Sequence, residues 1–196
     1  MRLRFGPIPE NQEFEPMTEG YLKLKEPSPN KFLLLAGILS IFVLFIFEII
    51  LYFIDIDFSL YHFNDIIYFL IAFIAIVPLH EFIHAVVFPG FPKSDRITIG
   101  FWKEKTLFYA FYDGDMSVKS FKLSLAMPFI VLTIIFFVLA WITKNRLITF
   151  MLLANAVGSS GDLLSLYIIR KLPNNAIVKN KGWQTYWKCE NRNNKT

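Results

Sequence analysis

Four long apolar runs dominate the sequence, and few ionisable residues interrupt them. They cover residues 32–54, 66–88, 123–142 and 147–169. A helix needs about 20 apolar residues to cross the hydrocarbon core of a bilayer, so each run is long enough to span it. The pattern predicts an all-α polytopic membrane protein with four transmembrane helices.

The segments outside these runs are polar. We expect residues 1–31 to form an irregular segment with one short strand near residues 21–25. Residues 171–196 are rich in Lys and Asn, and we expect them to form a tail that is only partly ordered. The loop 89–122 contains two β-rich stretches, RITIGFW and LFYAFYDG, separated by KEKT, which is the pattern of a hairpin. We therefore expect a membrane domain over residues 32–170, with a small β-hairpin between its second and third helices.

Basic residues are distributed unevenly among the polar segments. Of the 20 Lys and Arg residues, five precede the first run, six lie in the loop 89–122 and seven follow the last run, whereas the other two connections hold only Lys144 and Arg146. Cytoplasmic loops carry the excess of Lys and Arg. The pattern predicts a cell-membrane protein with both termini and the long loop in the cytoplasm. It also accounts for the net charge of +4 without a nucleic-acid surface.

The polar N-terminus lacks the apolar core of a cleaved signal peptide, so the first span is expected to serve as an uncleaved anchor. Cys189 is the single cysteine of the chain. One thiol forms no disulfide framework, and it excludes a metal site built on several thiolates.

The second run contains the sequence HEFIH at residues 80–84. Residues four apart lie on one face of a helix, so ring nitrogens of His80 and His84 can reach a single metal ion. Glu81 is adjacent to them and near enough to take a proton from an activated water. Ionisable groups cost about 2.5–3.5 kcal/mol each at the centre of a membrane helix, which indicates a function for these three. The alternative is a pair of neutral histidines that are hydrogen-bonded inside the helix bundle.

A catalytic zinc site needs a third protein ligand. At a rise of 1.5 Å per residue, His80 and Asp162 both lie about 12 Å from the cytoplasmic ends of their spans. By the same rise Glu48 lies about 12 Å too far out, and His62 is on the outer side. Asp162 is therefore the predicted third ligand.

Small and polar residues around Asp162 recur at helical spacing and form one stripe on the fourth span. Such a stripe faces protein or a water-filled cavity rather than lipid, although close helix packing alone also explains its small residues. The stripe consists of Asn155, Gly158, Ser159, Asp162 and Ser165.

These residues resemble those of a known family. The HEFIH pair on one span and the later stretch NAVGSSGD are similar to the site-2 proteases, which are intramembrane zinc metalloproteases. The sequence PLHEFIH, followed by FPG and later by AMPFI, is still more similar to the bacterial membrane proteins grouped as "putative zincin peptidases". The resemblance implies that His80, His84 and Asp162 are zinc ligands and Glu81 is the general base. It also implies that Asn155 helps to hold the substrate or the oxyanion.

Together these observations predict an integral membrane zinc metallopeptidase with its site near the cytoplasmic face. Its substrate would be a peptide or a membrane-protein segment, and an exposed edge of the predicted hairpin could hold that chain in extended form. The hairpin could also simply cover the cytoplasmic end of the bundle. The alternative functions are a catalytically idle protein that binds metal or a ligand, such as a sensor or transporter accessory, and a purely structural membrane protein.

Overall fold

The computed structural model describes residues 1–56 and 63–190, and in these ranges the four predicted spans are helical. His62 lies outside the described residues. The helices are α1 (Pro29–Phe53), α2 (Phe63–Val87), α3 (Val118–Thr143), α4 (Arg146–Gly158) and α5 (Ser160–Ile169), with the short 3₁₀ helix η1 (Lys103–Lys105). Four segments are long and apolar enough to cross a membrane, and α4 and α5 together form the fourth of them.

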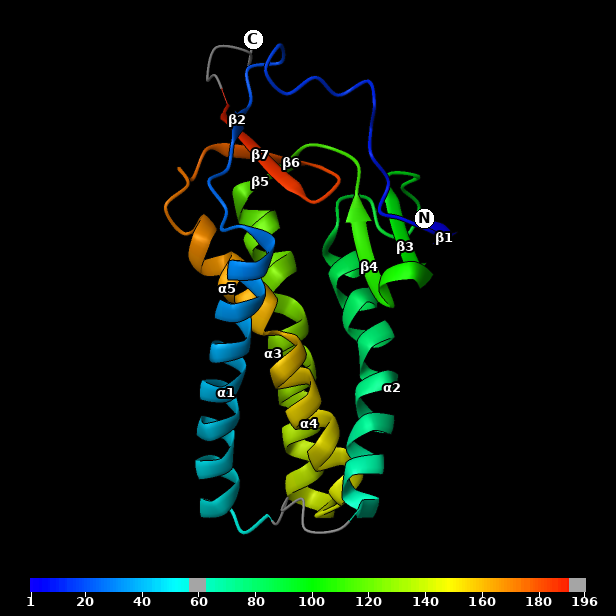
Figure 1. Ribbon diagram of the computed structural model, residues 1–196, viewed down its shortest axis with the longest axis vertical. Coiled ribbons are helices and arrows are strands. Elements are labelled where there is room, and N and C mark those ends of the chain that lie inside the picture. Colours follow the sequence, from blue (N-terminus) through cyan, green and yellow to red (C-terminus); the bar gives the residue numbers. More distant parts are fainter. Residues whose placement is uncertain (57–62, 191–196) are drawn as a thin grey trace. The chain divides into compact units, whose positions relative to one another are not determined.

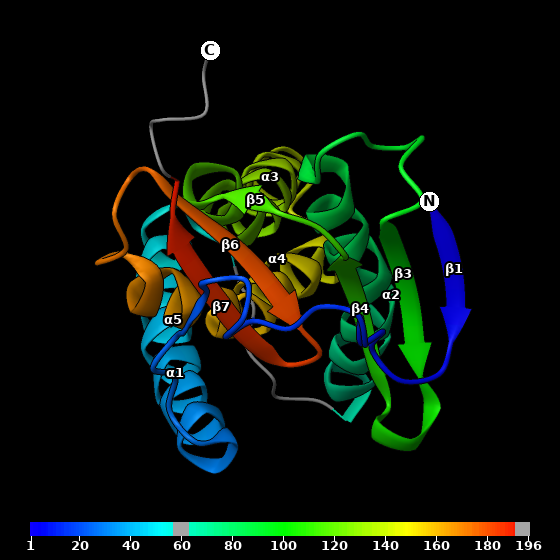
Figure 2. The same ribbon diagram turned by 90° about the horizontal axis from the view of Figure 1, so that it is seen from above.

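The strands form two small sheets, which is more β-structure than the single predicted hairpin. The strands are β1 (Arg2–Phe5), β2 (Leu22–Lys23), β3 (Ile97–Trp102), β4 (Leu107–Tyr112), β5 (Met116–Ser117), β6 (Ala176–Lys181) and β7 (Gln184–Cys189). One sheet has the order β1-β3-β4, and the other has the order β2-β7-β6-β5 (Figure 2). Strands β3 and β4 form an antiparallel pair in the loop where the hairpin was predicted, and the cytoplasmic location of this hairpin stays a prediction. The short strand expected near residues 21–25 is β2.

The chain divides into two compact units. The first contains residues 1–26, 81–124 and 168–196, and the second contains residues 27–80 and 125–167. The first unit therefore holds both sheets, and the second holds most of the helical residues that are apolar enough to cross a membrane. The division predicted from the sequence, into a terminal segment, a membrane domain and a tail, stays a prediction.

The helices of the second unit differ in how much of their surface is covered. α1 buries Val43, Phe47 and Leu51, a stripe with a spacing of four residues, and packs along α4 (Figure 1). Only 11% of its most apolar window is buried, whereas 50% of the window over α4 and α5 is buried. A helix that is apolar on every side and mostly uncovered suits a lipid environment. The fourth span is therefore the central one, which explains why it carries the polar stripe.

A small apolar core joins the first sheet to the end of α2. Ala85 and Phe88 pack with Ile97, Tyr112 and Met116, and all five are buried. The core holds β3 and β4 against the last turns of α2, the turns that carry Glu81 and His84. The hairpin is thus fixed beside part of the HEFIH sequence.

The fourth span is interrupted at Ser159, where the sequence predicted one continuous helix. Two serine hydroxyls bond back to the preceding turn: Ser159 Oγ donates to Asn155 O at 2.8 Å, and Ser160 Oγ donates to Ala156 O at 3.4 Å. Such back-bonding competes with the helical hydrogen bonds and bends helices. The interruption separates Asn155 on α4 from Asp162 on α5.

Candidate metal centre

His80, Glu81 and His84 all lie on α2, which runs unbroken from Phe63 to Val87. Each histidine is only 8% exposed, and Glu81 is half-buried. Because residues i and i+4 share a helix face, the two imidazoles lie one turn apart on the same side of α2. Pro78 lies two residues before His80, inside the helix.

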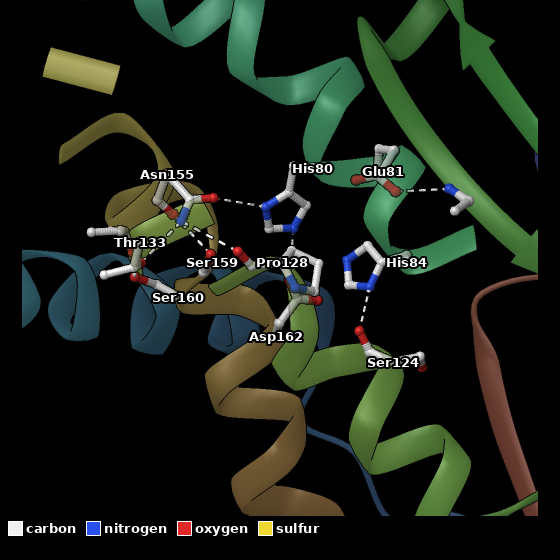
Figure 3. A network of polar contacts seen from close by, with 12 residues as sticks. His80, Glu81, His84, Ser124, Pro128, Thr133, Asn155, Ser159, Ser160 and Asp162 are labelled. Atoms are coloured by element: carbon white, nitrogen blue, oxygen red, sulfur yellow. Dashed lines mark hydrogen bonds and ion pairs between the residues drawn. The ribbon is translucent and has the colours of Figure 1, made fainter. Parts of the chain in front are cut away.

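Both ring nitrogens of His80 have polar partners in the second unit (Figure 3). Nε2 lies 2.9 Å from Asp162 Oδ2, and Nδ1 lies 3.4 Å from Asn155 Oδ1. Asn155 donates its Nδ2 hydrogens to Thr133 Oγ1 at 3.2 Å and to Pro128 O at 3.5 Å. A carbonyl oxygen only accepts, so its contact with Nδ2 fixes the orientation of the Asn155 amide, with Oδ1 toward His80.

This orientation assigns the hydrogen on His80. Since Asn155 Oδ1 only accepts, Nδ1 carries a hydrogen, and the neutral ring then points the lone pair of Nε2 toward Asp162. A lone pair and a carboxylate oxygen at 2.9 Å repel each other unless a cation lies between them. A proton or a metal ion would satisfy both groups.

His84 is oriented in the same way. Its Nδ1 lies 2.8 Å from the backbone carbonyl oxygen of Ser124 in α3. The carbonyl accepts, so Nδ1 is again the donor and Nε2 carries the lone pair. A metal-ligating histidine commonly donates its other N–H to such an acceptor, which fixes the tautomer and the ring orientation.

His80, His84 and Asp162 each offer one ligand atom, and these atoms lie within 4.8 Å of one another. In a tetrahedral zinc site with bonds of 2.0–2.1 Å, ligand atoms are about 3.3 Å apart, and His80 Nε2 lies 2.9 Å from Asp162 Oδ2. Two imidazoles and one carboxylate form a ligand set of catalytic zinc sites, which leave the fourth position open. The residues present therefore fit a zinc ion. Glu48 lies exposed on α1 and does not belong to this group.

Glu81 contacts the edge of the first sheet. Its Oε2 accepts a hydrogen bond of 2.7 Å from the backbone N–H of Ala110 in β4, the end strand of the order β1-β3-β4 (Figure 3). Ala110 pairs with Ile99 in the antiparallel register, and in such a pair the N–H groups alternate between the two sides of the strand. The Ala110 N–H thus points away from β3, and the N–H groups of Tyr109 and Phe111 point toward it. The Asp113 N–H continues this alternation by donating to Arg96 O in the direction of β3.

The sequence prediction missed three partners in the centre: the carbonyls of Ser124 and Pro128 and the N–H of Ala110. All three are backbone groups, so no side-chain motif reports them. One signal was available, because Pro128 follows Ser124 at the helical hydrogen-bonding distance of four residues. Asn155 was expected near substrate; it is fully buried, and its amide contacts Thr133, Pro128 and His80.

Comparison with known proteins adds a family to this geometry. The model of a family described as "Putative zincin peptidase" matches residues 73–177, just over half of the chain and the whole segment from His80 to Asp162. The chain belongs to this family. Zincins are named for a zinc-dependent active site, which agrees with the ligand set found on α2 and α5.

One curated relative is itself uncharacterised. It is the "Uncharacterized 24.7 kDa protein in gap 5'region" of Pyrococcus woesei, which is 26% identical over 123 residues. The match covers 61% of this chain and 54% of the relative, so the chain spans about half the length of the curated relative it matches. No solved structure matches the chain.

Proposed function

We propose that this protein is an integral membrane zinc metallopeptidase that hydrolyses peptide bonds near the cytoplasmic face of the cell membrane. The observation that carries the proposal is the group of His80, His84 and Asp162, with Glu81 next to the first ligand on α2. The family match, the four membrane-capable segments and the excess of basic residues in the expected cytoplasmic segments support it.

In the proposed site the Nε2 atoms of His80 and His84 and the carboxylate of Asp162 would hold zinc. When bound, the zinc ion supplies a Lewis acid that polarises the scissile carbonyl and lowers the pKa of water toward 7. Glu81 acts as the general base: its carboxylate accepts the proton of the attacking water and then delivers it to the leaving amine. Glu81 follows the first ligand on α2, and its carboxylate contacts β4, along which the proposed substrate would lie.

We assign Asn155 a positioning role in this site. Its Oδ1 is the acceptor for His80 Nδ1, and Thr133 and Pro128 hold its amide in the required orientation. Such outer partners fix the tautomer of a ligating histidine and raise its basicity. The role expected from the resemblance, holding substrate or the oxyanion, would require the Nδ2 hydrogens to leave these two partners.

The outer edge of β4 is the proposed binding site for substrate. An extended chain can add to an exposed strand through backbone hydrogen bonds. The Ala110 N–H points to this edge and contacts Glu81, so a chain paired there would pass beside the general base. The proposed substrate is therefore a peptide or membrane-protein segment in extended form, and a helical substrate would have to unfold locally before it pairs with β4.

The test compares the wild type with Glu81→Gln in reconstituted membranes, using a mixture of unstructured fluorogenic peptides and a labelled single-span protein. The proposal predicts cleavage by the wild type, loss of cleavage in Glu81→Gln and full zinc content in both proteins. Zinc binding without cleavage by the wild type of any substrate would favour the idle metal-binding alternative. Cleavage that persists in Glu81→Gln would contradict the assigned general base.

A further inference from the structure

Pro128 interrupts the hydrogen-bond ladder of α3 at one defined carbonyl. In an α-helix the N–H of residue i+4 donates to the carbonyl of residue i, so residue 128 would be the donor for Ser124 O. Proline has no N–H, and Pro128 lies inside α3. The Ser124 carbonyl therefore lacks its helical donor, although Ser124 is only 2% exposed.

This carbonyl is the one that accepts from His84. The distance from His84 Nδ1 to Ser124 O is 2.8 Å, a short hydrogen bond between a buried imidazole and a buried backbone oxygen. A carbonyl within an intact ladder points along the helix axis toward its donor, whereas a proline opens the ladder and lets the carbonyl tilt outward. The imidazole thus replaces the amide hydrogen that proline lacks.

The carbonyl of Pro128 serves the other histidine. Pro128 O accepts from Asn155 Nδ2 at 3.5 Å, and Asn155 Oδ1 faces His80 Nδ1 at 3.4 Å. Pro128 consequently contributes to the orientation of both imidazoles. Its missing N–H leaves the Ser124 carbonyl to His84, and its own carbonyl oxygen accepts from Asn155, which contacts His80. A proline that only bends α3 for packing would have no reason to align with both rings.

We infer that Pro128 is a positioning residue of the metal centre: by withholding an N–H from Ser124 it makes that carbonyl the acceptor that turns Nε2 of His84 toward the metal. The inference rests on the proposed zinc site and goes beyond it, because it assigns a role to a backbone donor that is absent. A restored N–H at position 128 would compete with His84 for Ser124 O, and His84 would lose its fixed tautomer.

The experiment uses two replacements of Pro128 that differ only in whether the backbone at this position has an N–H group or an ester oxygen. Pro128→Ala restores the N–H, and Pro128→lactic acid, introduced as a backbone ester, has the same methyl side chain without the N–H. Zinc affinity of the full chain in detergent is measured by competition with a chromophoric chelator. The tautomers of the histidines in the metal-free protein are measured by ¹⁵N NMR, and its melting temperature is measured by circular dichroism.

We expect Pro128→Ala to weaken zinc binding about 10- to 100-fold, the usual effect of losing an outer partner, without lowering the melting temperature of the metal-free protein. We expect the ester to bind zinc within threefold of the wild type. The NMR signal of His84 should change from Nδ1–H toward a mixture of tautomers in Pro128→Ala only. Equal zinc affinity of the wild type and Pro128→Ala would overturn the inference, as would an equal loss in Pro128→Ala and the ester.

Failure of the proposed function gives a different result. A wild type that binds no zinc would remove the metal site, while the NMR measurement on the metal-free protein would still report whether the absent N–H sets the tautomer of His84. An unchanged His84 tautomer in Pro128→Ala, together with normal zinc binding in the wild type, would remove the role of Pro128 alone.

Discussion

Two substitutions of Asn155 separate its contribution to the metal site from its contribution to stability. Asn155→Leu removes the acceptor for His80 and both donors. Asn155→Asp keeps an acceptor oxygen beside His80 Nδ1 but loses the hydrogens that bind Thr133 and Pro128. If Asn155 positions His80, zinc affinity should fall only when the acceptor oxygen beside His80 is lost. The free energy of unfolding should fall whenever the Nδ2 hydrogens are lost.

The expected changes in stability and zinc affinity follow from the hydrogen bonds of the Asn155 side chain, which is fully buried. Each hydrogen bond contributes about 0.5–1.5 kcal/mol. Asn155→Leu loses all three and should lower the stability of the metal-free protein by roughly 1.5–4.5 kcal/mol, whereas Asn155→Asp loses the two donated bonds and should lower it by roughly 1–3 kcal/mol. Losing the outer partner of a ligating histidine weakens metal binding about 10- to 100-fold, and we expect this loss in Asn155→Leu. The zinc dissociation constant of Asn155→Asp should be no more than threefold above that of the wild type, because a carboxylate accepts a hydrogen bond from Nδ1 more strongly than an amide oxygen does.

The assay pairs chelator competition for the zinc dissociation constant with thermal unfolding of the metal-free protein in the same detergent. The reasoning is refuted if Asn155→Leu binds zinc as tightly as the wild type. It is also refuted if both substitutions weaken zinc binding equally, because Asn155 would then act only through the packing of α3 and α4.

Three further predictions test other parts of the structure. Glu81→Gln should keep zinc and lose at least 100-fold in cleavage rate, the contribution of a general base; a peptidase assay with metal analysis checks this. Ala110→Pro removes the outward N–H and with it the 2.7 Å hydrogen bond to Glu81, whereas Phe111→Pro removes a donor to β3. Both should impair cleavage, and Phe111→Pro should lower the melting temperature more; cleavage by Ala110→Pro at the wild-type rate would contradict the edge as a binding site. Arg146→Met leaves the carboxylate of buried Asp65 without its 3.0 Å partner and should cost roughly 1–3 kcal/mol of stability, measured by thermal unfolding, while zinc affinity stays unchanged.

The four long apolar helical segments were predictable because their signal is carried by length and apolar composition. α1 and α2 begin three residues before the predicted runs, and α2 ends at Val87, one residue before the run does. The interruption at Ser159 was not predicted, because serine hydroxyls that bond to the preceding turn leave hydropathy unchanged. The spacing within HEFIH and the depth of Asp162 predicted three metal ligands, and one ligand atom of each lies within 4.8 Å of the others. Their role as ligands stays a prediction.

The missed strands share a different cause. β1 pairs in parallel with β3, and each paired residue lies 96 positions from its partner, as Arg2 and Thr98 do. A strand whose partner is so distant has no local turn signal. β6 and β7 form a hairpin in the tail expected to be only partly ordered, with Gly182 at φ 56° in the turn. Burial alternates along the start of β6, where Ala176 and Val178 are buried and Ile177 and Lys179 are partly exposed, a strand pattern that overall composition conceals.

The central claim is a zinc site formed by two histidines of α2 and one aspartate of α5. The most direct measurement is the zinc content of the detergent-purified protein, compared with His80→Ala and Asp162→Ala that retain the wild-type helix content. The account predicts about one zinc per chain in the wild type and its loss in both variants. A folded wild type that takes up no zinc when zinc is supplied would contradict it, and His80 and Asp162 would then be a hydrogen-bonded pair that serves only to pack α2 against α5.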